Sequence, residues 1–276
     1  MSQRSDVFQA LLPQRQRLGF WELGAFIALV LLLVLLGLPL VSLVWQVPLP
    51  DLLRLLQTPL VVAALRLSLI TSVTSAAVIV VLGLPVALLL AMKTFPGKRA
   101  LEVMINLPMV MPPTVAGLGL LLAFGRSGTT GRILSTMGIS IPFTTLAVIL
   151  AQTFVAAPFF INTARAGFES VEARYIQAAA TLRASPACTF FRVMLPLSLH
   201  SLLAGMAMSW ARALGEFGAT ITFAGNMPGR TQTMPLAVYV ALQTDLKSAV
   251  TLSTILLIVS FGLLFTLRSV VVRPSK

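Results

Sequence analysis

Two opposite charges stand four residues apart in an apolar stretch of this chain, at Arg212 and Glu216. On a helix this spacing places both side chains on one face. Charges at membrane depth are costly and usually face a bundle interior or water, so the two residues are candidates for a permeation path or its gate. The alternative is a mutual ion pair, or a pair at a contact between subunits, with no role in a path.

The apolar surroundings of this pair are typical of the whole chain. Of the 276 residues, 57% are hydrophobic and 10% are charged, and the mean hydropathy is +0.95. A soluble domain carries roughly 25% charged residues, so most of this surface must face lipid or other protein. The composition therefore predicts one membrane domain.

Six segments are long enough to span a bilayer, which takes about 20 mostly apolar residues. They cover approximately residues 21–45, 60–92, 101–124, 143–163, 200–223 and 249–267. The expected fold is an all-α, polytopic bundle of about six transmembrane helices over residues 21–268, with residues 1–20 and 269–276 as short tails. The first run is too long for the apolar core of a cleaved signal peptide, so we expect it to remain as a span.

Lysine and arginine are distributed unevenly between the segments that connect these spans. One alternating set of segments holds 13 of them and the opposite set holds five. Cytoplasmic segments carry the excess, which predicts a multi-pass protein of the cell (inner) membrane with both tails and a loop at about 165–198 in the cytoplasm. The net charge of +12 is then no sign of nucleic-acid binding, because no basic module with stacking aromatic residues is present.

Few residues are available for catalysis or for metal binding. The single cysteine, Cys188, excludes an internal disulfide, and the single histidine, His200, excludes a metal site built from several histidines. The sequence contains no G-x-x-x-x-G-K-[ST] phosphate loop. We therefore expect no metal, no cofactor and no ATP hydrolysis on this chain.

Proline interrupts the third span at Pro108, Pro112 and Pro113. Each proline removes a helix donor and obstructs the preceding turn. Broken backbone at membrane depth is tolerated where protein or a water-filled cavity covers it. Pro112 and Pro113 thus mark either a kink that shapes packing or a helix that lines a path at the bundle centre.

The loop at 165–198 is expected to contain two short helices. Ser170 is a suitable cap for the first, which should expose Ala178 to Ala180 and stop near Arg183. Ser185-Pro186 begins the second, which should end before Pro196. Such a helix pair is either an amphipathic hairpin on lipid headgroups or a docking element for a soluble partner.

This stretch resembles the cytoplasmic EAA loop of ABC importer permeases, whose pattern is Glu-Ala-Ala, three residues, Gly, nine residues, Ile, any residue, Leu-Pro. The spacing is kept, but Gln177 replaces the acid and Arg183 replaces the glycine. The resemblance implies that an ATPase subunit docks here. The residues concerned are Gln177, Ala178, Ala179, Leu182, Arg183, Ser185, Pro186, Leu195 and Pro196.

Two further segments, ARALGEFGATITFAGNMPGRTQTMPLAVY at 211–239 and MPPTVAGLGLLLAFGRSGTTG at 111–131, are similar to molybdate and tungstate permeases. The resemblance covers about residues 60–268 and implies a type I importer permease. It also implies two copies of the chain in the bilayer, two ATPase subunits that bind ATP and Mg²⁺, and an extracytoplasmic oxyanion-binding protein. The path or gate would then include Arg212, Glu216, Phe217, Thr220, Pro112 and Pro113.

The two departures from the loop pattern lead to separate expectations. Arg183 must either tighten the turn without positive φ or accept a strain of roughly 1–2 kcal/mol. Gln177 keeps hydrogen-bonding capacity without charge, so docking would depend on shape and neutral hydrogen bonds.

Other functions remain open at this point. The sister group of sulfate and thiosulfate permeases shares the fold implied by the resemblance. A gradient-driven secondary transporter usually needs titratable groups at the midplane, and Glu216 is the only acid well inside a span. A membrane enzyme would need paired acids or a histidine-bound metal, which are largely missing.

Overall fold

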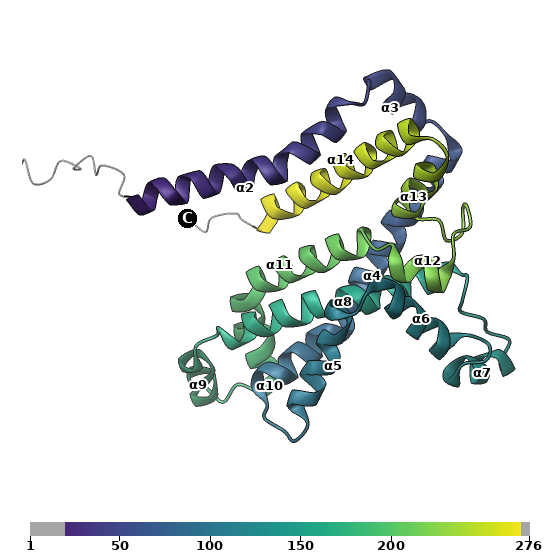
Figure 1. The fold of residues 1–276 in the computed structure, drawn as a ribbon. Helices are drawn as coiled ribbons and strands as arrows, with labels where there is room; N and C mark the ends of the chain where they lie inside the picture. Colours follow the sequence, from purple (N-terminus) through teal and green to yellow (C-terminus); the bar gives the residue numbers. More distant parts are fainter. Residues whose placement is uncertain (1–19, 272–276) are drawn as a thin grey trace, which may run out of the picture. The chain divides into compact units, whose positions relative to one another are not determined.

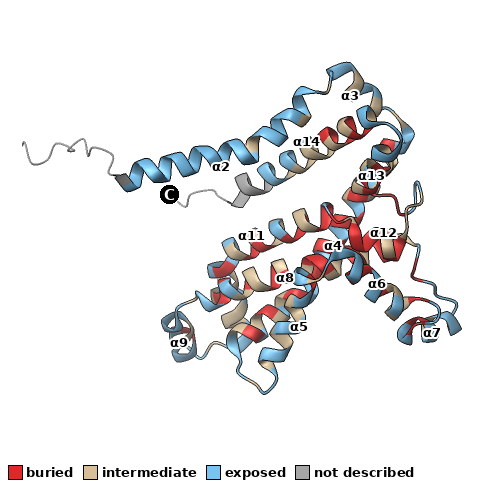
Figure 2. Ribbon diagram, in the orientation of Figure 1, coloured by how far each residue is buried: buried red, intermediate tan, exposed pale blue. Residues whose placement is uncertain are grey.

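The computed structural model of the protein describes residues 20–271, and all regular secondary structure in this range is helical. The chain divides into two units, residues 1–47 and 48–276. The described part of the first is α2 (Phe20–Trp45), an apolar helix whose side chains are nearly all exposed (Figure 2). Its 26 residues measure about 39 Å, enough to cross the hydrocarbon core of a bilayer.

The second unit holds the remaining helices (Figure 1). In chain order they are α3 (Leu49–Leu56), α4 (Pro59–Met92), α5 (Lys98–Val110), α6 (Pro113–Phe124), α7 (Thr129–Thr136), α8 (Thr145–Glu169), α9 (Ala173–Thr181), α10 (Pro186–Thr189), the π-helical turn η1 (Phe190–Met194), α11 (Leu195–Leu214), α12 (Gly218–Ala224), α13 (Met234–Thr244) and α14 (Leu246–Val271).

Helix α8 is the central helix of this unit, since it packs against α4, α11, α5, α6 and α12. Near one end its buried Phe160 and Phe168 join a cluster with Leu90 of α4 and Met194 of η1. Near the other end Val148 and Val155 pack with residues of α6 and α12. Both candidate sites are therefore supported by the same helix.

A stripe of buried hydroxyl groups on α4 ties this helix to its neighbours. Ser72 Oγ accepts a hydrogen bond from Trp210 Nε1 of α11 at 3.0 Å, and Ser75 Oγ donates to Gln152 Oε1 of α8 at 3.1 Å. Ser68 Oγ accepts from the Met234 N–H at 2.7 Å. Because apolar contacts alone give little association between helices in lipid, such polar contacts hold a membrane bundle together.

The prediction of about six spans is confirmed. In the described residues, five helices are long and apolar enough to cross a membrane, or six if the bent pair α5–α6 counts as one span. Sequence reasoning did not anticipate α3, α7 and α13, because it searched for stretches of about 20 apolar residues and these helices have between 8 and 11.

The third predicted span, 101–124, is two helices with a bend of 118° between them. Met111 is held in an extended conformation by the ring of Pro112, and two successive prolines leave no donor with which to continue the helix. Pro108, by contrast, lies inside α5 without ending it.

The fifth predicted span, 200–223, is wrong at both ends. A continuous helical segment begins at Pro186 and ends at Leu214, so the second loop helix does not stop before Pro196. The reason lies in η1, where the Leu195 N–H bonds to the Phe190 carbonyl, five residues back. This wider turn precedes Pro196, which has no N–H to donate, and the helix continues beyond the ring.

Candidate functional site

The first candidate site is the turn that joins α9 to α10. Arg183 has φ 54°, its N–H donates to the Ala180 carbonyl, and the Ala184 N–H donates to the Ala179 carbonyl, both at 3.0 Å. These two bonds form a Schellman motif, in which a left-handed residue ends the helix. The turn therefore accepts the strain at Arg183, the second of the two predicted outcomes.

The helix after this turn begins as predicted. Ser185 Oγ accepts a hydrogen bond from the Cys188 N–H at 3.2 Å, and Pro186 occupies the first helical turn. From Pro186 the helical backbone runs through α10, η1 and α11 to Leu214, over 29 residues. The turn is thus joined directly to a membrane-spanning helix.

The surface of the turn is apolar and exposed. Leu182 has 82% of its surface exposed and Phe191 has 64%. Gln177, Ala178, Arg183, Ser185 and Pro186 are exposed beside them. Leu195 and Pro196 lie outside the turn, at the start of α11.

Two predictions about this turn were wrong. Ala179 is buried, because α9 packs one face against η1 and the three consecutive alanines cannot all point outward. Ser170 does not cap α9: it ends α8, and its Oγ donates to the Gly167 carbonyl at 2.8 Å. The residue that precedes α9 is Glu172, whose carboxylate pairs with Arg174 Nε at 2.7 Å.

The second candidate site is the place where two interrupted helices meet. One interruption separates α5 from α6, and the other, at Gly215-Glu216-Phe217, separates α11 from α12. A Cβ atom at Gly218 would lie 2.6 Å from Pro113 Cβ, and one at Gly117 would lie 2.6 Å from the Ala219 carbonyl oxygen. Glycine at both positions is therefore required for the contact between α6 and α12.

Arg212 and Glu216 form a close ion pair at this junction. Arg212 Nη1 lies 2.6 Å from Glu216 Oε2, and the Glu216 side chain is only 1% exposed. Glu216 lies in the interruption rather than on the helix of Arg212, which ends at Leu214. Its Oε1 accepts the Ala219 N–H at 2.9 Å, so the carboxylate also caps α12.

This geometry favours the mutual ion pair over a path-lining role for Glu216. Both carboxylate oxygens have partners, and a buried pair that loses one member leaves a costly uncompensated charge. Arg212 differs, because 29% of its side chain remains exposed. Only the arginine of this pair offers surface to an approaching anion.

The other predicted path residues have different surroundings. Pro112 and Pro113 are exposed, whereas Thr220 is fully buried and presents no surface to a passing ion. The half-buried Phe217 ring lies 5.0 Å from the ring of Tyr239 on α13. Tyr239 was missed because α13 is too short to be recognised as a span.

Comparison with known proteins agrees with this architecture. Several apolar spans, one of them a bent pair of helices, together with an exposed turn joined to a spanning helix, are the architecture expected of a membrane transport permease. Residues 79–275 match the family described as the binding-protein-dependent transport system inner membrane component. The chain belongs to this family, whose members are permease subunits of ABC importers.

Among similar proteins, the molybdenum transport system permease protein ModB of Mycobacterium tuberculosis is 44% identical over 83% of this chain and 86% of its own length. The probable transport system permease protein NifC of Clostridium pasteurianum is 38% identical over 73% of this chain and 71% of its own length. The probable sulfate transport system permease protein cysT of Nephroselmis olivacea is 31% identical over 94% of this chain and 92% of its own length.

Two solved structures share the fold. A bacterial ABC transporter involved in import of the acidic polysaccharide alginate has a TM-score of 0.73 at 15% identity, with 93% of this chain and 96% of that chain covered. The MetNI methionine ABC transporter has a TM-score of 0.61 at 22% identity, with 77% and 94% covered.

Replacing Arg183 by glycine should stabilise the protein by about 1 kcal/mol, because glycine adopts positive φ without a Cβ penalty. The free energy of unfolding in detergent, measured by denaturant titration, tests this. Arg183→Ala is the matched control, since it removes the same side chain but keeps the strain. Equal effects of the two substitutions would contradict the strained turn.

Replacing Gly117 by alanine should destabilise the protein by about 1–3 kcal/mol, because the new methyl group meets the backbone of α12. Gly119 lies on the same helix, and a Cβ there meets no atom within 4 Å. Thermal unfolding of Gly117→Ala and Gly119→Ala should therefore differ, with a lower midpoint for the first. Matching midpoints would show that α6 and α12 do not pack this closely.

Proposed function

We propose that this chain forms the membrane path for molybdate in an ABC importer. The observation that carries the proposal is the 44% identity to ModB over 83% of the chain, against 31% to the sulfate permease relative. Tungstate shares the charge and shape of molybdate and is the next candidate, and sulfate or thiosulfate is the alternative. The identity of the oxyanion would be set largely by the binding protein that delivers it.

The assembled transporter would contain two copies of this chain, two ATPase subunits and an extracytoplasmic oxyanion-binding protein. ATP and Mg²⁺ would be bound by the ATPase subunits rather than by this chain. Both tails and the turn between α9 and α10 would lie in the cytoplasm, as the excess of Lys and Arg on that side predicts.

The turn would be the docking element. Leu182 is an unusually exposed leucine, and exposed apolar side chains surrounded by polar residues mark contact sites for other proteins. Gln177, Ala178, Arg183, Ser185 and Pro186 would form the edge of the contact. Leu195 and Pro196 would act on the helix beyond it rather than on the ATPase.

Movement of the docked subunits would reach the second site along one helix. The segment Pro186–Leu214 connects the turn to the interruption at residues 215–217. Glu216 holds the start of α12, and α12 packs against α6 through Gly117 and Gly218. A displacement of α11 would therefore move the junction beside Arg212, Phe217, Pro112 and Pro113, which would gate the path.

Replacing Leu182 by aspartate should reduce co-purification of the ATPase subunit and abolish molybdate uptake, because a charge replaces the apolar centre of the contact. Ile133→Asp on α7 is the matched control: Ile133 is also exposed, at 65%, but lies outside the turn. Pull-down from detergent and uptake of labelled molybdate by proteoliposomes measure the two effects.

Three outcomes of this experiment would count against the proposal. Co-purification that is equal for both variants would exclude docking on the turn. Uptake that persists without ATP but needs an ion gradient would indicate a secondary transporter. Uptake of sulfate in preference to molybdate, with either binding protein supplied, would move the chain to the sulfate group.

A further inference from the structure

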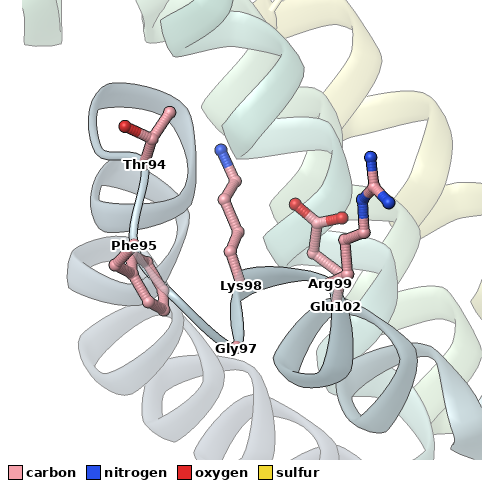
Figure 3. A pocket seen from close by; sticks show the side chains of 6 residues that line it. All are labelled: Thr94, Phe95, Gly97, Lys98, Arg99 and Glu102. Atoms are coloured by element: carbon pink, nitrogen blue, oxygen red, sulfur yellow. The ribbon is translucent and has the colours of Figure 1, made fainter.

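A cationic pocket lies where α4 turns into α5, and its Phe95 packs against the same buried cluster as Ile176 of α9 and Phe190 of η1. It has a volume of about 420 Å³ and is lined by Thr94, Phe95, Gly97, Lys98, Arg99 and Glu102. Figure 3 shows Lys98 between Thr94 on one side and Arg99 with Glu102 on the other. Neither the family resemblance nor the docking turn assigns a role to these residues.

The positive charge of the pocket is not cancelled by its own acid. Glu102 Oε1 is bound to Arg165 Nη1 of α8 at 2.8 Å, and the same guanidinium binds Glu169 at 2.7 Å. Within the described part of the chain, the structure records no ion pair for Lys98 or Arg99. Lys98 Nζ donates to the Lys93 carbonyl at 3.2 Å, which keeps its charge at the pocket.

An apolar strip continues from the pocket along α5. Val103, Leu107 and Val110 follow Arg99 at helical spacings of four, four and three residues, so they lie on one face below it. Their side chains are 61%, 47% and 83% exposed. A cationic pocket followed by an exposed apolar strip has the polarity of a phospholipid, with its phosphate above its acyl chains.

The position of the pocket along the chain also agrees with binding of a phospholipid. Helix α4 has 34 residues and measures about 51 Å, so its end at Met92 reaches at least the headgroup level of a bilayer about 40–45 Å thick. The next helix then returns toward the hydrocarbon. The turn between them therefore lies at or beyond the level of the lipid phosphates.

We propose that this pocket binds a tetrahedral oxyanion group through Lys98 and Arg99. Two sources supply this chemistry: the phosphate of an anionic phospholipid, and a free oxyanion such as molybdate leaving the path. The apolar strip favours the phospholipid. Only the free-oxyanion source rests on the proposed transport function.

The test compares two double variants of the full chain that lose the same charge. Lys98→Gln/Arg99→Gln removes the pocket cations. Arg126→Gln/Arg132→Gln removes two exposed arginines of the segment around α7. Both are purified with the ATPase subunit, and circular dichroism and size-exclusion chromatography check that each is folded.

Native mass spectrometry then measures retained phosphatidylglycerol after extraction from nanodiscs of phosphatidylcholine with phosphatidylglycerol. We expect retention about tenfold lower in the pocket variant than in the control variant, since each Lys or Arg near the membrane surface strengthens anionic lipid binding severalfold. In a second arm, titration with inorganic phosphate and with molybdate shows whether a free oxyanion occupies the same pocket.

The possible results distinguish a lipid phosphate from a free oxyanion, and two of them would contradict the proposed site. Loss of phosphatidylglycerol alone assigns the pocket to lipid, and loss of free oxyanion binding alone assigns it to the cargo; either supports the site. Equal binding of all three probes by both variants overturns it. So does loss of the ATPase subunit with lipid and oxyanion binding unchanged, which would make the pocket a protein contact. Intact molybdate uptake in any of these cases leaves the proposed function standing.

Discussion

The contact between α6 and α12 is the constraint on which the second site depends. Helices α6 and α12, each of which follows an interruption of the helical backbone, can approach only because Gly117 and Gly218 have no side chain at the contact. The Glu216 carboxylate then holds the start of α12 and the Arg212 guanidinium together. Without this junction the interruptions would be unsupported backbone, and in lipid each unpaired polar group costs several kcal/mol.

The same junction explains how one buried acid can be retained in an apolar bundle. A carboxylate enclosed to this degree requires a compensating charge and further hydrogen bonds. Glu216 has the charge of Arg212 and one hydrogen bond from the Ala219 N–H, and Arg212 keeps part of its surface exposed at the end of α11. The field at the exposed side of the pair is therefore that of an arginine whose charge is partly neutralised.

Sequence reasoning predicted the class of fold and much of the turn between α9 and α10, because apolar length, proline and helix caps act locally. The cap at Ser185 followed directly from such rules, whereas for Arg183 they left two outcomes open, of which the structure has the left-handed one. The continuation of the helix through Pro196 could not be predicted, since it depends on a π-helical turn that no local rule requires. The burial of Ala179 likewise depends on which face α9 turns toward η1, a matter of tertiary packing.

The residues predicted to line a path illustrate a second limit of sequence reasoning. The spacing of Arg212 and Glu216 predicted their proximity, but not that α11 ends between them. The contact of Phe217 with Tyr239, and the glycine contacts between α6 and α12, each join residues on separate elements that are more than 20 positions apart in the sequence. A single sequence carries no signal for such pairs. Packing between distant helices is what the structure adds.

The central claim is that the docking turn moves the junction of α6 and α12 through one continuous helix. The most direct measurement is the distance between spin labels at two exposed positions, Leu118 on α6 and Met208 on α11, in the assembled transporter. Cys188 is first replaced by serine so that only these positions react. The account predicts that this distance differs between the ATP-free and ATP-bound states. An unchanged distance, with ATP hydrolysis and uptake intact, would contradict it.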